Sequence, residues 1–538
     1  MSEPAAPSTA PEAAPVAAAP PAAAPPAAAP PARGALLVTA GILASRLIGL
    51  VRQRFVAHYL GTSDAADAVA AAFRVGNITQ NLLGEGTLSA SFIPTYARLR
   101  ARSPSAAHAL ARAAFGWILL ISTVLSILGA VFAPALAGAV AAGYEGDKAT
   151  LTAELVRILF PMTGVLVVGA WSLGILTSHR RFLIPYAAPV LWSAAQIGAL
   201  VIAGRLAGVS RPGLARAVAW GALAGAGLQL AVMLVPVRRI LGGIAPSLDR
   251  SAEGLGDVVR RLPGAVLGRG ILQISGLIDT WLVSFLGAGA NATFMYAQTA
   301  YLLPMALLGT GEAAASLPSL SEVDLTNEAE RRSMVAGLGR SLTRVAVLAV
   351  GATVVFVVLG PEVVTVLFRG GSFDQASSLA VASALAAYGA GLPANAASRI
   401  VSTVCFAMGD TRRPATFAAI RVVVSTAVSV VAMRRFGVPG VIFGAVVAAW
   451  IELALLTRAV RRALGATGFA EVPLGKLVLT GLAPALVGLG ARYGVARLHV
   501  GHLLSALAVL SLAGGAFLVV ADRLKVLGVR SLLRARRR

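Results

Sequence analysis

The sequence predicts an all-α, polytopic membrane protein, and three observations lead to this fold class. Of its 538 residues, 57% are apolar and 13% are charged, and the mean hydropathy is +0.79. Soluble domains are usually about 45–50% apolar and about 25% charged, so this composition excludes a soluble multi-domain protein. Apolar runs of about 20 residues, enough to cross the hydrocarbon core of a bilayer, follow one another from Gly34 onward. They lack the alternation typical of barrel strands, so we expect helices.

About fourteen runs have this length, which predicts about fourteen transmembrane helices joined by short polar segments. Glycine and proline interrupt several of them, notably at Gly84, Pro94 and Pro304, and such breaks are tolerated where the freed backbone faces protein or water. The predicted spans are 34–60, 66–97, 106–142, 150–178, 184–205, 213–236, 256–287, 291–318, 331–359, 376–408, 412–434, 438–464, 473–497 and 500–523.

An internal repeat divides these spans into halves. The segment 82–94 resembles 307–318, and 180–185 resembles 412–414. Both pairs are about 230 residues apart and link spans that are six apart, which predicts two pseudo-symmetric six-helix lobes around a central cavity. The predicted organisation is a disordered Ala/Pro-rich tail (1–33), an N-terminal lobe (34–236), a cytoplasmic linker (237–255), a C-terminal lobe (256–464), two extra C-terminal helices (465–525) and a basic cytoplasmic tail (526–538).

The basic residues predict the orientation. The chain has 46 Lys and Arg against 23 Asp and Glu, a formal charge of +23, which in a soluble protein would suggest a nucleic-acid partner. Here the arginines cluster in alternate gaps between apolar runs, so we expect no nucleic acid, and the positive-inside rule places these gaps and both termini in the cytoplasm. The gaps carry Arg98, Arg100, Arg102, Arg180, Arg181, Arg238, Arg239, Arg260, Arg261, Arg412, Arg413, Arg458, Arg461 and Arg462.

Enzyme and metal chemistry find little support in the sequence. Cys405 is the only cysteine, which excludes an internal disulfide and a cysteine-based zinc cluster, and five scattered histidines predict no metal site. A phosphate-binding loop, a serine nucleophile elbow and a His-Glu-x-x-His helix are all lacking. We therefore expect a transporter without catalytic residues, and an integral-membrane enzyme is the weakest alternative.

Charged residues inside the predicted spans mark the candidate site, because a charge at mid-bilayer costs about 2.5–3.5 kcal/mol on insertion scales. Arg46 and Arg52 lie six residues apart in the first span, which is about 120° of helical rotation, so both can border one cavity. Asp67, Arg74 and Glu85 follow in the second span. Together they predict a wet cavity for an anionic head group such as a diphosphate, which arginine grips with its planar fork. For Arg46, snorkelling or a structural pair with Asp67 or Glu85 is the alternative.

In the second lobe, Arg269 and Asp279 interrupt the seventh span. They are ten residues apart, which places them near one helix face. A structural ion pair with neighbouring spans is an equal alternative to a role in the cavity.

Several motifs, in order along residues 35 to about 525, resemble the MurJ (MviN) family of lipid II flippases. They are Ser45-Arg46-Leu47-Ile48-Gly49-Leu50-Val51-Arg52, Phe73-Arg74-Val75-Gly76-Asn77, Gly84-Glu85-Gly86, Arg181-Phe182-Leu183-Ile184-Pro185, Leu367-Phe368-Arg369-Gly370-Gly371-Ser372-Phe373 and Gly409-Asp410-Thr411.

The resemblance implies a fold of the multidrug/oligosaccharidyl-lipid/polysaccharide exporter type, in which two lobes alternate access. Its members move undecaprenyl-diphosphate-linked peptidoglycan precursor from the inner to the outer leaflet of the bacterial cytoplasmic membrane, for cell-wall synthesis. In the resemblance, Arg46 and Arg52 match cavity arginines of the family, Arg74 matches a basic position, and Asp67 and Glu85 match acidic positions of the same lobe. We expect all five to belong to the substrate-binding site, where Arg46 and Arg52 hold the diphosphate and Asp67 and Glu85 position those two arginines. The two extra C-terminal helices would form a groove for the polyprenyl tail.

The resemblance also implies coupling and partners. Some members bind sodium in the second lobe, and Asp279, Asp410 and Thr426 are the nearest matches here, so we expect coupling to sodium or protons and no other cofactor. Expected partners are the polyprenyl-diphosphate lipid, membrane lipids and cell-wall synthesis proteins.

Two departures from the family pattern keep alternatives open. Gln80 and Thr299 stand where the family usually has cavity arginines, and Arg269 is the candidate that would restore the lost positive charge. One alternative is an exporter of another polyprenyl-linked saccharide or of a small molecule. An alternative of another class is a non-transporting membrane scaffold.

Overall fold

The computed structural model describes residues 32–206, 208–309, 327–497, 501–524 and 526, and every regular element among them is helical. The first bundle consists of α1 (Ala32–Leu60), α2 (Asp64–Leu83), α3 (Glu85–Arg102), α4 (Pro104–Val131), α5 (Ala133–Val140), α6 (Gly146–Ser178), α7 (Leu183–Ala187), α8 (Pro189–Val201), the π-helical turn η1 (Ile202–Leu206) and α9 (Arg211–Leu241). α10 (Leu255–Ser284) connects it to the second bundle.

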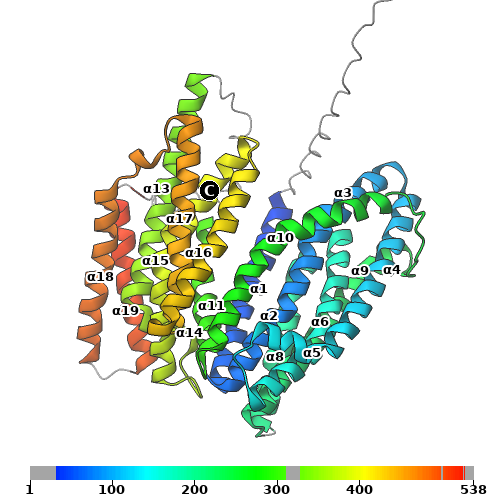
Figure 1. The fold of residues 1–538 in the computed structure, drawn as a ribbon, viewed down its shortest axis with the longest axis horizontal. Helices are drawn as coiled ribbons and strands as arrows, with labels where there is room; N and C mark the ends of the chain where they lie inside the picture. Colours follow the sequence, from blue (N-terminus) through cyan, green and yellow to red (C-terminus); the bar gives the residue numbers. More distant parts are fainter. Residues whose placement is uncertain (1–31, 207, 310–326, 498–500, 525, 527–538) are drawn as a thin grey trace, which may run out of the picture.

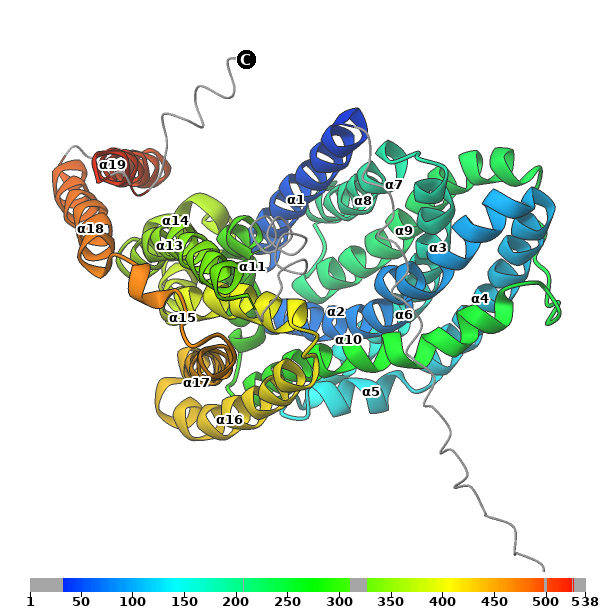
Figure 2. The ribbon, with the colours of Figure 1, turned by 90° about the horizontal axis from the view of Figure 1, so that it is seen from above.

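The second bundle consists of α11 (Ala290–Gly309), α13 (Glu328–Val358), α14 (Gly360–Phe368), α15 (Gln375–Ala407), α16 (Arg412–Phe436) and α17 (Val438–Leu464). After the short 3₁₀ turn η2 (Phe469–Glu471), α18 (Leu474–Ala496) and α19 (His502–Arg523) pair with each other on the outer side of this bundle, away from the first (Figures 1 and 2). This arrangement confirms the predicted all-α fold with two lobes and two extra C-terminal helices.

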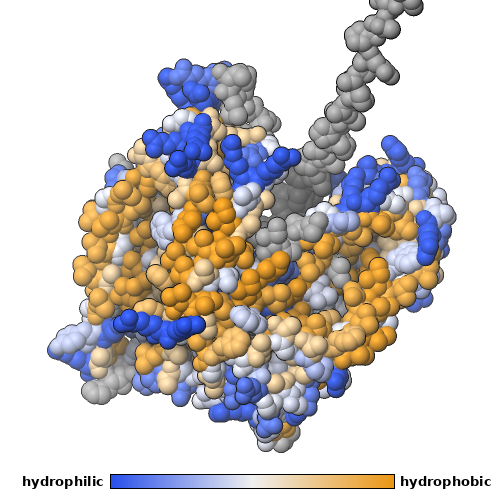
Figure 3. Space-filling view, viewed as in Figure 1, coloured by the Kyte–Doolittle hydropathy of each residue, from blue (hydrophilic) through white to orange (hydrophobic). Residues whose placement is uncertain are grey.

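The apolar composition produces a membrane-spanning surface. Ten helices among the described residues are long and apolar enough to cross a bilayer. In Figure 3 apolar residues dominate the middle of the face shown, and polar residues gather at its upper and lower ends. The predicted total of about fourteen spans stays a prediction, because several predicted spans are broken into shorter helices or lie partly outside the described residues.

The breaks in the helices have local causes. The predicted span 66–97 is divided at Gly84, which ends α2 and begins α3 with a backbone unlike either helix. Other helices begin at polar caps: Ser63 accepts from the backbone N–H of Ala66, and Ser103 stands before a proline at the first turn of α4. Such residues satisfy donors that the first turn of a helix leaves unpaired, so they fix where each helix starts.

The two ends of the molecule differ in charge. One end, which we call the basic end, contains the last turns of α3, α6, α9 and α17 and the first turn of α16 (Figure 1). These helix ends carry Arg98, Arg239, Arg461 and Arg412, and Arg180 follows α6. The opposite end, with the α1–α2 and α10–α11 turns, is called the gate end. The bundles meet at the gate end and diverge toward the basic end (Figure 1). One apolar cluster crosses from α1, α2 and α6 to α11, α14 and α15.

α10 follows neither bundle along its whole length. Its first turns share an apolar cluster with α3 and α4, where Leu255 and Val258 pack with Phe92 and Leu110. Its later turns pack against α2, α11 and α16. By the sequence repeat α10 begins the second lobe, yet at the basic end it rests on the first bundle.

The Ala/Pro-rich tail up to residue 31 and most of the basic tail lie outside the described residues, and so does the second copy of the 82–94 repeat from residue 310.

Candidate functional site

Asp67 joins the two bundles at the gate end. Its side chain is fully buried, and its oxygens accept hydrogen bonds from the backbone N–H groups of Gly289 at 2.7 Å and Ala292 at 2.8 Å. Gly289 immediately precedes α11 and Ala292 lies in its first turn, so Asp67 of the first bundle caps a helix of the second. The negative charge also stabilises the positive end of the helix dipole. Lys148 of α6, in the first bundle, adds an ion pair at 2.5 Å.

Further hydrogen bonds surround this contact. Tyr144 donates to the backbone oxygen of Asp67 at 3.4 Å and accepts from the Asn291 side chain at 2.6 Å. The hydroxyls of Thr62 and Ser377 lie 2.8 Å apart, again across the bundles. We call the contacts of Asp67, Thr62, Tyr144 and their partners the gate.

The turn between α14 and α15 closes the gate from the second bundle. The N–H of Ser372 donates to the carbonyl of His58 at 2.7 Å, and Tyr296 donates to the carbonyl of Gly61 at 3.1 Å. Gly61 has a φ of +58°, and a side chain there would also overlap the backbone of Ser372. Glycine is therefore required both by the backbone conformation and by the close approach of the two turns.

Arg74 lies between the bundles, farther from the gate end. Its guanidinium donates to Thr280 of α10 at 3.2 Å and to Gln298 of α11 at 3.1 Å. These groups line a cavity of about 100 Å³ together with Phe73 and Asn77. The structure thus places Arg74 in an interbundle cavity.

Arg52 and Arg46 do not meet in this conformation. The Arg52 guanidinium packs over the ring of Trp192 on α8, 4.7 Å from its centroid, and its buried Nε has no hydrogen-bond partner in the part of the chain that the structure describes. Arg46 is exposed. Gln53 comes seven positions later, close to two full helical turns, so both residues lie on nearly the same face of α1. Because Gln53 donates to Thr299 of α11 at 3.5 Å, this face points toward the second bundle.

The expected association of Asp67 with the arginines is wrong for this conformation. The partners of Asp67 are Lys148 and the start of α11, because the buried carboxylate lies at the gate rather than in the cavity. The side chains of Glu85 and Arg269, which the sequence also predicts as site residues, lie outside the described residues.

The proposed sodium ligands are not brought together. Asp410 pairs with Arg413 at 3.3 Å at the basic end, and Thr426 donates to the carbonyl of Val422, one turn earlier in its own helix. Thr426 is fourteen residues into α16, about 21 Å along its axis from the end where Asp410 lies. Asp279 is on α10, where Arg74 and Arg421 attract its carboxylate. Among the described residues, no group of three or more metal-binding side chains of the His, Cys, Asp and Glu types is present.

Sequence reasoning missed Lys148 and an ion pair inside the second bundle. Arg421 of α16 binds Glu452 of α17 at 2.7 Å and the Asn395 side chain of α15 at 2.8 Å. Arg421 and Glu452 interrupt predicted spans, so the rule that singled out Arg46 could also have found them.

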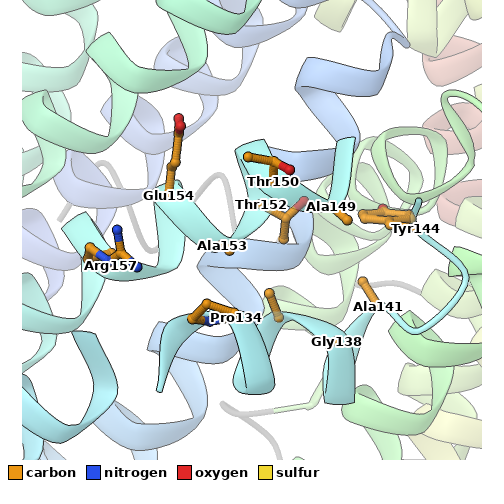
Figure 4. Close-up of a pocket in the computed structure, with 11 residues that line it drawn as sticks. Pro134, Gly138, Ala141, Tyr144, Ala149, Thr150, Thr152, Ala153, Glu154 and Arg157 are labelled. Atoms are coloured by element: carbon orange, nitrogen blue, oxygen red, sulfur yellow. The ribbon is translucent and has the colours of Figure 1, made fainter. Parts of the chain in front are cut away.

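A separate hollow of about 400 Å³ lies on the first bundle alone, between α5 and α6 (Figure 4). Tyr144 is at one end of it, and Glu154 and Arg157 are at the other. Glu154 is already paired with Arg216 of α9 at 2.7 Å. Because its walls come from one bundle, this hollow does not lie on a path between the bundles.

Comparisons with known proteins agree with this arrangement. A family model described as "Lipid II flippase MurJ" matches residues 56–514. A probable lipid II flippase MurJ of Rhizobium meliloti (strain 1021) is 31% identical over 429 residues, covering 78% of this chain and 78% of the relative. The lipid II flippase MurJ of Burkholderia cenocepacia is 30% identical over 392 residues, covering 71% and 74%.

Solved structures share the fold. The structure described as "Lipid II flippase MurJ, inward closed conformation" superposes with a TM-score of 0.73 at 19% identity, covering 93% of this chain and all of the other. An inward-facing multidrug resistance MATE family transporter of the MOP superfamily has a TM-score of 0.64 at 18% identity, covering 80% and 98%. The match over residues 56–514, with the level of identity to the curated relatives, shows that the chain belongs to the MurJ family of lipid II flippases.

Proposed function

We propose that this protein is a flippase that carries lipid II, an undecaprenyl-diphosphate-linked peptidoglycan precursor, from the inner to the outer leaflet of the bacterial cytoplasmic membrane. Family membership supports the substrate, and the gate at Asp67 supports the mechanism. Bundles that are bonded together at one end and diverge at the other form one of the two states that alternating access requires.

The orientation follows from charge. Positively charged loops favour the cytoplasm, so the basic end and both termini lie there in our proposal. The conformation is then inward-facing, with the gate closed toward the outside. Cell-wall synthesis proteins outside the membrane would receive the flipped precursor.

Arg74 is our candidate for the residue that binds the diphosphate. Its present acceptors, Thr280 and Gln298, are neutral, and a charged phosphate oxygen forms stronger, charge-assisted bonds with a guanidinium. The cavity of about 100 Å³ is smaller than the 300–1,000 Å³ typical of small-molecule sites, so loading requires the bundles to separate further at the basic end. Arg46, exposed on the α1 face toward α11, would meet the head group on its way in.

For the driving force we propose the membrane potential, or a sodium or proton gradient, acting on charges between the bundles. Asp410 and Thr426, two of the three residues that match the family's sodium ligands, are about 21 Å apart along the axis of α16, which does not support one shared site. Arg74 and Asp279 are two charged residues near the cavity on which a gradient would act.

A second candidate substrate is another polyprenyl-linked saccharide. Thr299 stands where the family usually has an arginine, and here it accepts a neutral hydrogen bond from Gln53. The cavity therefore presents less positive charge than the resemblance implies.

Complementation tests the proposal. The wild-type chain should restore growth to a strain depleted of its own lipid II flippase, and lipid II should become accessible at the outer face. Arg74→Gln should lose this activity, whereas Arg98→Gln, an exposed arginine of α3 at the basic end, should keep it. Normal insertion of both variants is checked by their abundance in the membrane. Failure of the wild type to complement, with transport of another polyprenyl-linked saccharide, would support the second candidate.

A further inference from the structure

An apolar groove of about 670 Å³ lies between α3, α4 and the start of α10. Phe92, Ile121 and Val259 are among the side chains that line it, and Ile121 and Val259 are 48% and 54% exposed. Trp117 and Arg250 lie along the same groove. It shares no lining residue with the interbundle cavity around Arg74, so we treat it as separate from the path proposed above.

The groove lies at the boundary between the apolar and polar parts of the surface. Arg112 is the last charged residue of α4, and residues 113–131 of this helix carry no charge. Trp117 follows just inside the apolar part, the level that tryptophan prefers in membrane proteins. Phosphates of a phospholipid leaflet lie at this level, with acyl chains extending along the apolar helix faces.

Arg250 is held over the groove by a fixed loop. The N–H of Ser247 donates to the carbonyl of Arg112 at 3.1 Å, and this loop approaches Gly116 so closely that a side chain there would overlap its backbone. At the other end of the loop, Gly254 has a φ of +83° and packs against Thr95 of α3. Two glycines thus allow the loop to lie directly on α3 and α4.

The charge of Arg250 is available to a ligand. Its guanidinium stacks over the ring of Trp117, 5.3 Å from the centroid. The carboxylate of neighbouring Asp249 instead accepts from the N–H and hydroxyl of Ser251, at 2.8 and 2.6 Å. Arg260, farther along the groove, is paired with Asp257 at 3.0 Å. No carboxylate among the described residues pairs with the Arg250 guanidinium, so an anion placed at the mouth of the groove would meet its charge.

We propose that this groove is a binding site for one anionic phospholipid, with its phosphate on Arg250 and an acyl chain along Phe92, Ile121 and Val259. Apolar walls and a cation at the headgroup level match the two parts of such a lipid. The bound lipid bridges α10 to α3 and α4, so it stabilises the packing of α10 on the first bundle. The site is distinct from that of the transported substrate and does not depend on transport.

Quenching of tryptophan fluorescence tests the site. The full chain in mild detergent is titrated with phosphatidylglycerol or phosphatidylcholine carrying brominated acyl chains, and the signal of Trp117 is obtained by subtracting a Trp117→Phe variant. We expect phosphatidylglycerol to quench this signal at about fivefold lower concentration than phosphatidylcholine, the factor that one arginine near a net negative headgroup supplies. Both lipids carry a phosphate, but the ammonium group of choline neutralises it in phosphatidylcholine. Arg250→Gln should lose the preference.

Arg462→Gln is the matched control, because Arg462 is an exposed arginine at the basic end of α17 in the other bundle. It should retain the preference, and unchanged thermal unfolding shows that Arg250→Gln is folded. Equal quenching by both lipids, or a preference that survives Arg250→Gln, would overturn the proposal. Displacement of the brominated lipid by undecaprenyl diphosphate, but not by unlabelled phosphatidylglycerol, would overturn it in favour of a second substrate site.

Discussion

Replacing Asp67 by Asn should release the gate. Asn has nearly the same size, but one carboxylate oxygen becomes an NH₂ group, which cannot accept from Gly289 or Ala292. Hydrogen bonds to charged groups contribute about 1.5–3 kcal/mol each. Asp67→Asn loses one of the two cross-bundle bonds and makes the acceptor of the other neutral, so the free energy that favours the closed gate should fall by about 3 kcal/mol. At about 1.4 kcal/mol per factor of ten, the population with an open gate should rise about 150-fold.

Cysteine labelling measures this population. Ser377 is buried at the gate, so Ser377→Cys, in a chain whose single cysteine is replaced by Cys405→Ser, reacts with a maleimide only when the bundles separate. When opening and closing are fast relative to labelling, the rate is proportional to the open population. We expect Asp67→Asn to raise the labelling rate by one to two orders of magnitude, up to about 150-fold.

Asp64→Asn is the control. Asp64 also pairs with Lys148, at 2.8 Å, but it is 60% exposed, and the contact lies within the first bundle. It should leave the labelling rate almost unchanged. Equal rates for the two variants would refute the assignment of Asp67 as the residue that holds the gate.

Three further predictions concern stability, measured by thermal unfolding in detergent. Glu452→Gln should destabilise the second bundle by about 2 kcal/mol, since it leaves the half-buried Arg421 without its carboxylate. Adding Arg421→Met should recover part of this stability. A double variant no more stable than Glu452→Gln would contradict an ion pair between the two residues. Gly116→Ala should lower the free energy of unfolding by about 1–3 kcal/mol, because its side chain would overlap the backbone of Ser247. Gly138→Ala, where the added side chain meets open space, should leave the stability unchanged. Equal effects would argue against the close approach at Gly116. Burial, together with nearby cations, lowers the pKa of His179 below its usual 6.5. The contribution of the neutral imidazole to the free energy of unfolding is therefore complete above pH 6.5 and is lost as the pH falls through the lowered pKa. His179→Asn should therefore flatten the decline of the unfolding temperature between about pH 7 and 5, and an unchanged slope would exclude this residue as its cause.

The fold could be predicted from the sequence because the bilayer imposes it. Run length and composition alone require helices of about 20 residues, and the arginine clusters mark one end of the bundles. The division of the second span at Gly84 was also readable, since glycine interrupts an apolar run there.

The partners of the charged residues could not be predicted. Asp67 was recognisable as an unusual charge in a span, but Gly289 and Ala292 are more than 220 residues away, and they bind through backbone N–H groups that carry no sequence signal. For Arg46 and Arg52, by contrast, the sequence predicts a shared cavity that the structure does not show. Their spacing allowed a shared cavity, yet 120° of rotation was enough for the Trp192 ring to hold one of them while the other stays exposed.

Lys148 has a consequence for the reversibility of the conformational change. When the bundles part, Asp67 must give up the amide groups of α11, and an isolated carboxylate in an apolar setting would make that step prohibitively unfavourable. The ammonium group travels with Asp67, because both sit on helices that stay together, so the anion keeps a neutralising companion throughout the cycle. The contacts of Asp67 with α11 can therefore break and form again in each transport cycle.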